Sequence, residues 1–402
     1  MTERVDVAIV GAGAAGLAAA GALAERDLVV RIFDEYPEAG GRLLGQRYRL
    51  GRRRWDGREV ASELLRSLHG RPHVFVATGV TVYEVAGDAT GGFLVRTHPD
   101  HDVTARRVLV ATGAGENPVP LPGWTLPGVM TVGGAQVMAV VHRVLPGRRG
   151  LIIGTGVLSF AIAAELHEAG VEWLGLVMAP ESDATAHLGS VTERWDALSH
   201  LGSVAPPLLR PLVRLLRRPA FRPLLINHYP RAGVALAGTH VHLHQVATRV
   251  VGDQEVAAVE LRHLDGRGQP MGPARLVPVD FVLLSGGLSP VTELLDPLGV
   301  RMTESPALGG RVPVLSSTGE TSHRGLYVAG NAGGIESGAV AVAQGRLVGL
   351  HIAHSLGGSR PELASALAAA QRSLSEVRRE APFEFNPGAR KEVVRVSQDS
   401  RA

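Results

Sequence analysis

Three glycines near the start of the sequence have the spacing of a site for the phosphates of a dinucleotide. Gly11, Gly13 and Gly16 follow the apolar stretch 5–10 and open an Ala-rich stretch. In this pattern the first glycine permits a tight turn, the second lets the backbone approach a pyrophosphate, and the third lets a helix lie close to a sheet. The N–H groups of the helix N-terminus then face the phosphates. Asp34 closes the pattern, because a carboxylate at the end of the next strand can accept hydrogen bonds from ribose hydroxyls.

These residues predict a strand, a glycine turn, a helix and a second strand that ends in an acid. We call this unit the first cradle; alone, it allows NAD or FAD.

Three later segments could line the same cradle. The turn 40–42 would let the backbone pass close to a pyrophosphate, with an ordinary surface turn as the alternative. A strand predicted over 103–110 runs into 111–114, where a glycine avoids a collision with a nucleotide. The segment 326–331 leads from a strand towards a small-residue helix predicted over 338–355, so that backbone N–H groups and one side chain could meet a phosphate or a ribityl chain.

The opening pattern recurs once, which predicts an internal structural repeat. Gly154 and Gly156 stand in the places of the first two glycines, but Ser159 replaces the third. The strand predicted over 171–178 ends in Val-Met-Ala-Pro, without an acid for an NAD ribose or an arginine for an NADP phosphate. For this second cradle three interpretations stay open: a nicotinamide dinucleotide, another adenine nucleotide, or a structural role.

The fold class predicted from these elements is α/β, with two Rossmann-like dinucleotide-binding domains, the second inserted into the first. Four prolines within 115–128 predict a crossover between the domains, and a buried strand that starts near Val279 is read as the return to the first domain. The predicted parts are 1–115 and 279–358 for the first domain, 116–278 for the inserted nucleotide-binding domain, and 359–402 for a C-terminal helix with a flexible tail.

Composition narrows the chemistry. The chain has 402 residues, 45% of them hydrophobic, 50 glycines and a net charge of +3, which suits a globular α/β protein. Basic residues are interleaved with acids, so nucleic acid is not an expected partner. The absence of cysteine excludes a redox-active disulfide, a thiolate nucleophile and cysteine-ligated iron–sulfur clusters, so redox chemistry needs a bound cofactor.

Location and surface features give weaker signals. The first predicted strand begins within the first five residues and no apolar run reaches a membrane span of about 18 residues, so the expected location is cytoplasmic. The Leu- and Arg-rich stretch 203–230 is read as a short helix or as a basic surface for a partner or an anionic lipid, which leaves peripheral membrane association open. His240, His242 and His244 alternate on a predicted strand and share one face, but without a nearby carboxylate no metal site is expected.

Together, the opening motif, the Ala111-Thr112-Gly113 strand end and the Tyr327–Asn331 segment resemble the FAD-binding set of two-dinucleotide-domain flavoproteins, over most of 1–356. The stretch 111–147 is more specific. It is similar to the flavin subunits of heteromeric dehydrogenases: opine oxidase A subunits, the middle subunit of hydrogen cyanide synthase, and alpha subunits of dye-linked proline dehydrogenase and sarcosine oxidase. The Ser285-Gly286-Gly287 strand end is similar to sarcosine oxidase alpha chains.

This resemblance implies an FAD in the first cradle, with a main-chain contact near Val80 to the adenine. The second cradle would use Gly154 and Gly156 for NAD(P) or another adenine nucleotide. The implied FAD-binding residues are Gly11, Ala12, Gly13, Ala14, Ala15, Asp34, Glu35, Gly41, Arg42, Val80, Ala111, Thr112, Gly113, Gly330 and Asn331.

Two departures from the family pattern bear on function. Asn331 stands where the family usually has Asp; it can still hydrogen-bond a ribityl hydroxyl but lacks the charge. The chain also has no cysteine-rich iron–sulfur module, so a small iron–sulfur protein and an amine-oxidase-type flavoprotein subunit are the implied partners.

The predicted function is therefore an FAD-dependent, electron-transferring subunit of a heteromeric amine or amino-acid dehydrogenase, acting on opine-, proline- or sarcosine-like substrates. No His or carboxylate has a spacing that forces it toward a flavin, so no catalytic acid or base is nominated. Two alternatives stay open: a self-contained NAD(P)H-dependent flavin reductase, and a non-catalytic nucleotide-binding scaffold.

Overall fold

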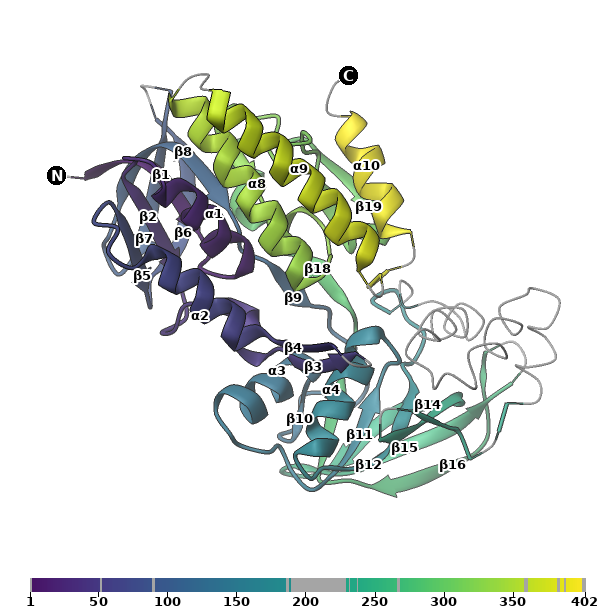
Figure 1. Cartoon of the computed structure of the whole chain (residues 1–402). Coiled ribbons are helices and arrows are strands. Elements are labelled where there is room, and N and C mark those ends of the chain that lie inside the picture. The colour runs from purple at the N-terminus through teal and green to yellow at the C-terminus, as the bar shows by residue number, and fades with distance from the viewer. Residues whose placement is uncertain are drawn as a thin grey trace. The chain divides into compact units, whose positions relative to one another are not determined.

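The computed structural model forms two compact units, each built around its own sheet (Figure 1). Unit 1 comprises 1–44, 56–115 and 288–402, and unit 2 comprises 45–55 and 116–287. The residues described are 2–50, 53–88, 91–185, 188, 229–230, 232–236, 238–265, 268–357, 361–381, 384–386 and 388–399.

The sheet of unit 1 is parallel in its centre and antiparallel at one side. β1 pairs in parallel with β2 and β8, β2 with β5, and β8 with β21, whereas β6, β7 and β8 form an antiparallel meander. Its strands are β5 (Val74–Thr78), β2 (Val30–Asp34), β1 (Glu3–Val10), β8 (Val103–Val110), β7 (Phe93–His98), β6 (Thr81–Gly87) and β21 (Leu326–Val328).

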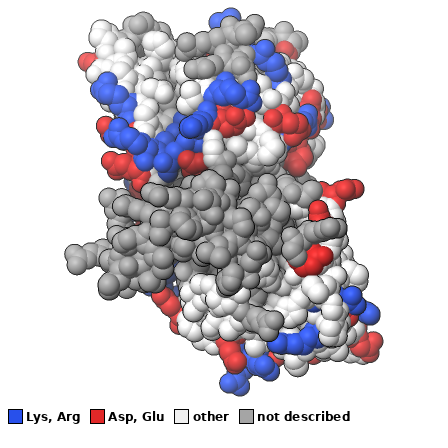
Figure 2. All heavy atoms as spheres, turned by 90° about the vertical axis from the view of Figure 1, so that its right-hand side faces the viewer, with Lys and Arg blue, Asp and Glu red and all other residues white. Residues whose placement is uncertain are grey.

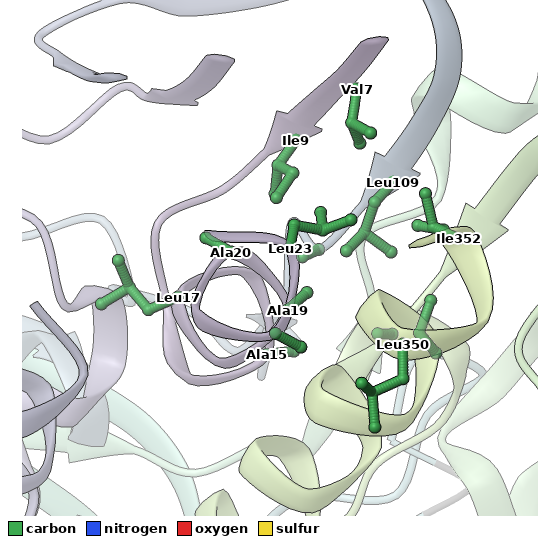
Figure 3. Packing of buried hydrophobic residues seen from close by; sticks show 14 of the residues in the cluster. Val7, Ile9, Ala15, Leu17, Ala19, Ala20, Leu23, Leu109, Leu350 and Ile352 are labelled. Atoms are coloured by element: carbon green, nitrogen blue, oxygen red, sulfur yellow. The ribbon is translucent and has the colours of Figure 1, made fainter. Parts of the chain in front are cut away.

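Helices cover this sheet through very small side chains. α1 (Ala14–Ala24) and α8 (Gly338–Gly357) pack against each other over the sheet, α9 (Pro361–Glu380) packs on α8, and α2 (Gly57–Leu68) lies beside α1. Figure 3 shows Ala15 and Ala19 of α1 facing α8, while Ile9 and Leu23 fill the space towards the sheet. Gly345 and Gly349 allow this approach, because a Cβ on either would lie 2.1 or 2.5 Å from a backbone oxygen of α1. The small-residue pattern thus sets a short distance between these two helices.

The sheet of unit 2 has the same parallel centre. β11 pairs in parallel with β12 and β17, β12 with β14, and β17 with β10, and β14, β15 and β16 form an antiparallel extension. Its strands are β10 (Val129–Thr131), β17 (Phe281–Leu284), β11 (Arg149–Ile153), β12 (Glu172–Met178), β14 (Thr239–Gly252), β15 (Val256–Leu264) and β16 (Pro270–Pro278), with β13 (Val234–Leu236) paired to β14.

Smaller elements complete the described chain. α4 (Val157–Glu168) follows β11, and α3 (Val132–Gln136) runs into a π-helical segment at Val137–Val141. α10 (Ala389–Asp399) lies near the C-terminus. The short strand pairs are β3 (Arg47–Leu50) with β4 (Arg53–Asp56), β9 (Ala114–Glu116) with β18 (Leu288–Pro290), and β19 (Met302–Ser305) with β20 (Gly310–Pro313).

The two units repeat one hydrogen-bonding pattern at the turn after the first strand. In unit 1 the N–H of Gly11 donates to the carbonyl of Phe33 at 2.7 Å. In unit 2 the N–H of Gly154 donates to the carbonyl of Val177 at 2.8 Å. The α/β fold with an internal repeat, predicted from the glycine patterns, is therefore confirmed.

Two predicted boundaries differ from the compact units. The strand predicted to return to the first domain at Val279 is β17, which pairs with β10 and β11 and so belongs to unit 2; unit 1 resumes only at Leu288. The segment 45–55, predicted within the first domain, also falls in unit 2. Both differences arise because sequence indicates the order of strands but not their partners.

The prediction of a flexible C-terminal tail is wrong for Ala389–Asp399, which forms α10. Its Ala389 and Val396 pack on Leu308, Val312 and Val314. The predicted amphipathic stretch 203–230 lies outside the described residues except for its last two positions.

Two surface findings complete the fold. One face shows Lys and Arg side chains mixed with Asp and Glu, rather than a field of one sign (Figure 2). Within the described part of the chain, no helix combines the length and the apolar character that crossing a membrane requires.

Candidate functional site: two cradles of unequal chemistry

The first cradle contains a turn that requires glycine at two positions. Gly11, directly after β1, has a φ of 103°, and a Cβ there would lie 2.4 Å from the carbonyl oxygen of Ala111. A Cβ on Gly16 would lie 1.9 Å from the carbonyl oxygen of Gly11. Because both obstacles are backbone atoms, no side-chain movement relieves them. The turn and the close approach of α1 to β1 therefore both depend on glycine.

The middle glycine, in contrast, faces open space. No heavy atom outside its own neighbours lies within 4 Å of a Cβ built on Gly13, and the same holds for Gly113 after β8. Gly13 is also the N-cap of α1, and no side chain caps this helix. The first N–H groups of a helix have no acceptor inside the helix. An uncapped N-terminus beside open backbone is the arrangement that a pyrophosphate requires.

Asp34 is fixed at the end of β2 by the backbone of the cradle. Its carboxylate accepts the N–H of Ala12 at 2.6 Å and the N–H of Tyr36 at 2.9 Å. Burial raises the pKa of Asp34 above its ordinary value of 3.8, against the lowering effect of these two N–H groups. A carboxylate accepts about four hydrogen bonds, so acceptor capacity remains for ribose hydroxyls.

Two further predicted segments meet the same turn. Gly41 has a φ of 53°, and a Cβ there would lie 3.1 Å from the Cα of Gly13. Gly330 has a φ of 71°, and a Cβ there would lie 2.9 Å from the Cβ of Ala15 in the first turn of α1. Segments far apart in the sequence therefore line one site.

Thr112 and Asn331 are oriented by hydrogen bonds within unit 1. The Thr112 hydroxyl donates to the carbonyl of Val291 at 2.7 Å, which leaves its oxygen as an acceptor. Oδ1 of Asn331 accepts the backbone N–H of Glu336 at 3.1 Å, which leaves the amide N–H groups as donors. Where the family usually has the carboxylate of an Asp, Asn331 therefore presents amide N–H groups that can donate hydrogen bonds.

The remaining predicted residues differ in how they could contribute. Glu35 and Arg42 have exposed side chains, and Ala14 is half-buried at the start of α1. The N–H of Val80 donates to the carbonyl of Asp34 at 2.9 Å, so only its carbonyl could contact an adenine.

The predicted turn 40–42 is tied to the first turn of the cradle, because the N–H of Gly40 donates to the carbonyl of Ala12 at 2.9 Å. Sequence reasoning missed one residue that shapes this site. Oε1 of Gln344 in α8 accepts the N–H of Gly330 at 3.0 Å. Gln344 had a weak signal, because it is a polar residue among small ones in the helix that follows the strand end.

The second cradle keeps the glycine geometry. Gly154 has a φ of 110°, and a Cβ there would lie 2.2 Å from the carbonyl oxygen of Ser285. Gly156 is the N-cap of α4 and, like Gly13, has no side-chain cap. The nearest atom to a Cβ on Gly156 would be Ser285 Oγ at 3.8 Å, an ordinary contact distance. The turn is therefore still able to approach a phosphate.

The position in the second cradle that is equivalent to Asp34, the predicted ribose-binding residue, however, holds the thioether of Met178. Phe33 and Val177 accept equivalent hydrogen bonds, so the next residues, Asp34 and Met178, occupy equivalent places at their strand ends. The Thr155 hydroxyl contacts Met178 Sδ at 3.9 Å, and both side chains are buried. Where unit 1 has a buried carboxylate that can bind a ribose, unit 2 has an uncharged thioether that accepts the Thr155 hydroxyl.

Ser159 fills the place of the third glycine without a clash. Its hydroxyl lies 2.7 Å from Ser285 Oγ and 3.1 Å from the carbonyl oxygen of Gly154. Both serines are buried, so this pair ties α4 to the end of β17. The side chain that replaced glycine has a structural role.

Comparison with known proteins agrees with this geometry. Residues 5–345 match the family model described as pyridine nucleotide-disulphide oxidoreductase. The opine oxidase A subunit from Rhizobium meliloti (strain 1021) is 32% identical over 376 residues, covering 89% of this chain and 73% of that protein. The hydrogen cyanide synthase subunit HcnB from Pseudomonas aeruginosa is 29% identical over 355 residues, covering 86% of this chain and 70% of that protein.

Solved structures share the fold. L-proline dehydrogenase from P. horikoshii superposes with a TM-score of 0.65 at 21% identity, covering 94% of this chain and 60% of that chain. Thioredoxin reductase from T. acidophilum gives a TM-score of 0.59 at 22% identity, covering 88% of this chain and 100% of that chain. The chain spans about two thirds of two further opine oxidase A subunits, 65% and 64% of their lengths.

The sequence has no cysteine, so it cannot form the disulphide in the family's description. The residues of the first cradle fit a dinucleotide, with an open glycine, an uncapped helix N-terminus and a carboxylate with spare acceptor capacity. The chain belongs to the pyridine nucleotide-disulphide oxidoreductase family and is an FAD-dependent oxidoreductase.

Proposed function

We propose that this chain is the electron-transferring flavin subunit of a heteromeric amine or amino-acid dehydrogenase, with FAD in the first cradle. The observation that carries the proposal is the inequality of the cradles. Asp34 equips the first for a ribose, whereas Met178 occupies that place in the second. A chain whose second cradle has no acid or arginine to bind the ribose of a nicotinamide nucleotide needs another source of electrons. A partner protein can supply them.

Each part of the first cradle would have a defined role toward FAD. The N–H groups at Gly13 and the start of α1 would bind the pyrophosphate, and Asp34 would bind the adenosine ribose. The amide of Asn331 would donate to the ribityl chain. When bound, FAD supplies an isoalloxazine that accepts and releases electrons, while the protein supplies position and electrostatics.

The relatives support a multi-subunit enzyme, because several carry the word subunit in their names: opine oxidase, hydrogen cyanide synthase and sarcosine oxidase. We propose an amine-oxidase-type flavoprotein as the partner that oxidises the substrate, a secondary amine or amino acid. A small iron–sulfur protein would connect the two flavoproteins, since this chain has no cysteine to hold a cluster. The proposed location is cytoplasmic.

The test is spectroscopic and uses the purified chain. A flavin absorbance band with about one FAD per chain is expected, and it should be lost on substitution of Gly13 by a bulky residue. Anaerobic mixing with millimolar NADH or NADPH should leave the flavin oxidised, whereas adding the partner flavoprotein together with its amine substrate should bleach it. A chain purified and reconstituted with excess FAD that still shows no flavin band would refute the proposal and favour a scaffold.

A second candidate is an NAD(P)H-dependent flavin reductase. The geometry of Gly154 and Gly156 favours it, because the turn of the second cradle remains open to a phosphate. Rapid bleaching of the flavin by NADH or NADPH in the isolated chain would establish this function instead.

A further inference from the structure

A partly buried ion pair joins α9 to the segment that follows Gly330. Nε of Arg378 donates to Oε1 of Glu336 at 3.0 Å, and its second terminal nitrogen donates to Oε2 at 2.7 Å. The two side chains are only 19% and 11% exposed. A bidentate arginine–carboxylate pair fixes direction as well as distance.

Glu336 lies between two parts of the proposed flavin site. Its backbone N–H is the group that donates to Oδ1 of Asn331. The next residue, Ser337, accepts the N–H of Val340 through its hydroxyl at 3.3 Å and so caps the start of α8. Glu336 therefore connects the ribityl-binding amide to the N-terminus of the helix beside it.

The remainder of α9 provides a firm base for Arg378. Leu363, Ala370 and Leu374 of α9 are buried in the same hydrophobic cluster as Ala15 of α1 and Leu347 of α8. Arg378 stands one turn beyond Leu374, so its guanidinium extends from a helix that is packed against the cofactor-binding layer.

We propose that Arg378 is a positioning residue for the flavin: by holding Glu336, it sets the orientation of Asn331 and compensates a carboxylate that would otherwise repel an anionic cofactor. This inference rests on the proposed binding of FAD in the first cradle. It gives α9 a functional role that its sequence, a polar helix after the nucleotide-binding elements, does not reveal.

The charge argument predicts a specific pattern among variants. Arg378→Gln leaves the mostly buried Glu336 carboxylate, 11% exposed, without its partner, and removing one member of such an ion pair costs more than removing both. We expect FAD to bind on the order of tenfold more weakly to this variant. Arg378→Gln with Glu336→Gln removes both charges, and affinity should return to within about threefold of wild type.

Arg379→Gln is the matched control. Arg379 is the next residue of the same helix, and its side chain is exposed. Removing an exposed arginine should change FAD affinity by less than about twofold. Arg378→Lys keeps the charge but loses the bidentate geometry, and it should bind FAD with intermediate affinity.

The experiment measures FAD affinity by titrating each apoprotein, and the apoprotein melting temperature and the flavin reduction potential alongside it. The expected result is weaker binding and a more negative potential for Arg378→Gln, both reversed in the double variant. A lower melting temperature with unchanged FAD affinity would show a purely structural tether and overturn the inference. If Arg378→Gln does not fold, the same comparison is made with Arg378→Lys, and equal affinity for wild type and Arg378→Lys overturns it. If wild-type protein binds no FAD, the proposed function fails, and the inference fails with it.

Discussion

Gly345→Ala tests whether the contact between α8 and α1 shapes the cofactor site. A Cβ on Gly345 would lie 2.1 Å from the carbonyl oxygen of Ala15 and 2.8 Å from its Cα. Carbon and oxygen atoms that are not bonded rarely approach closer than about 3.2 Å, and the opposing atoms here belong to the helix backbone, so the helices must separate by about 1 Å. Gly330 lies next to the same residue, Ala15, so a displacement of α1 by the added methyl group should also change the first cradle.

The expected magnitude follows from two opposing effects. Alanine favours a helix over glycine by about 1 kcal/mol. Overpacking a rigid interface costs about 1–3 kcal/mol and more where backbone atoms collide. We expect a net loss of about 2 kcal/mol in the free energy of unfolding, or a melting temperature lower by about 4–8 °C.

The control is Gly357→Ala at the end of the same helix, where no atom lies within 4 Å of the added Cβ. It should leave stability unchanged or raise it by about 0.5 kcal/mol. Thermal unfolding of both apoproteins and FAD titration provide the measurements. A Gly345→Ala protein as stable as the control, with unchanged FAD affinity, would refute the reasoning that these helices touch through their backbones.

Three further predictions concern the cradles. Gly13→Val should leave the apoprotein melting temperature nearly unchanged, because its Cβ enters open space, yet it should weaken FAD binding at least about 100-fold by blocking the pyrophosphate. Gly87→Val also enters open space and should change neither the melting temperature nor the FAD affinity. Equal FAD affinity for the two variants would contradict the assignment of Gly13 to the pyrophosphate site. Met178→Asp should tighten NAD⁺ binding to the second cradle, measured by calorimetry, by about tenfold, since a carboxylate could then accept from the ribose hydroxyls; unchanged affinity would show that this position does not select the ligand. Burial raises the pKa of Asp34 in the folded protein, so the folded state retains that proton more strongly than the unfolded state, and the group's contribution to stability falls as pH rises from 3.8 through the raised value. The stability of the Asp34→Asn apoprotein relative to wild type should therefore increase over this pH range in thermal melts, and a pH-independent difference would argue against the shift.

The sequence by itself determined the central elements of both cradles. GxGxxG set the strand, turn and helix order, because Gly11 and Gly154 need positive φ and close backbone contacts that other residues do not tolerate. The apolar run 103–110 predicted β8, since this pattern acts within a few residues. The missing acid after the second turn was also visible in sequence.

Long-range pairing lay beyond those local signals. An apolar run such as 281–284 reads the same in either sheet, and only its hydrogen bonds to β10 and β11 assign it to unit 2. Likewise, the C-terminal Arg-rich stretch has the composition of a mobile tail. It forms α10 because Val396 packs against Leu308 and Val312.

The tertiary structure also decided how individual side chains are used. The sequence shows only that Met178 stands where an acid would be expected. The structure adds that the Thr155 hydroxyl contacts its sulfur and that both side chains are buried. Sequence offered no reason to connect Arg378 with Asn331, because 47 residues separate them and nothing local relates the two. They are connected through Glu336 because the packing of α9 on α8 places the Arg378 guanidinium next to the Glu336 carboxylate. A local sequence pattern does not encode such packing between distant segments.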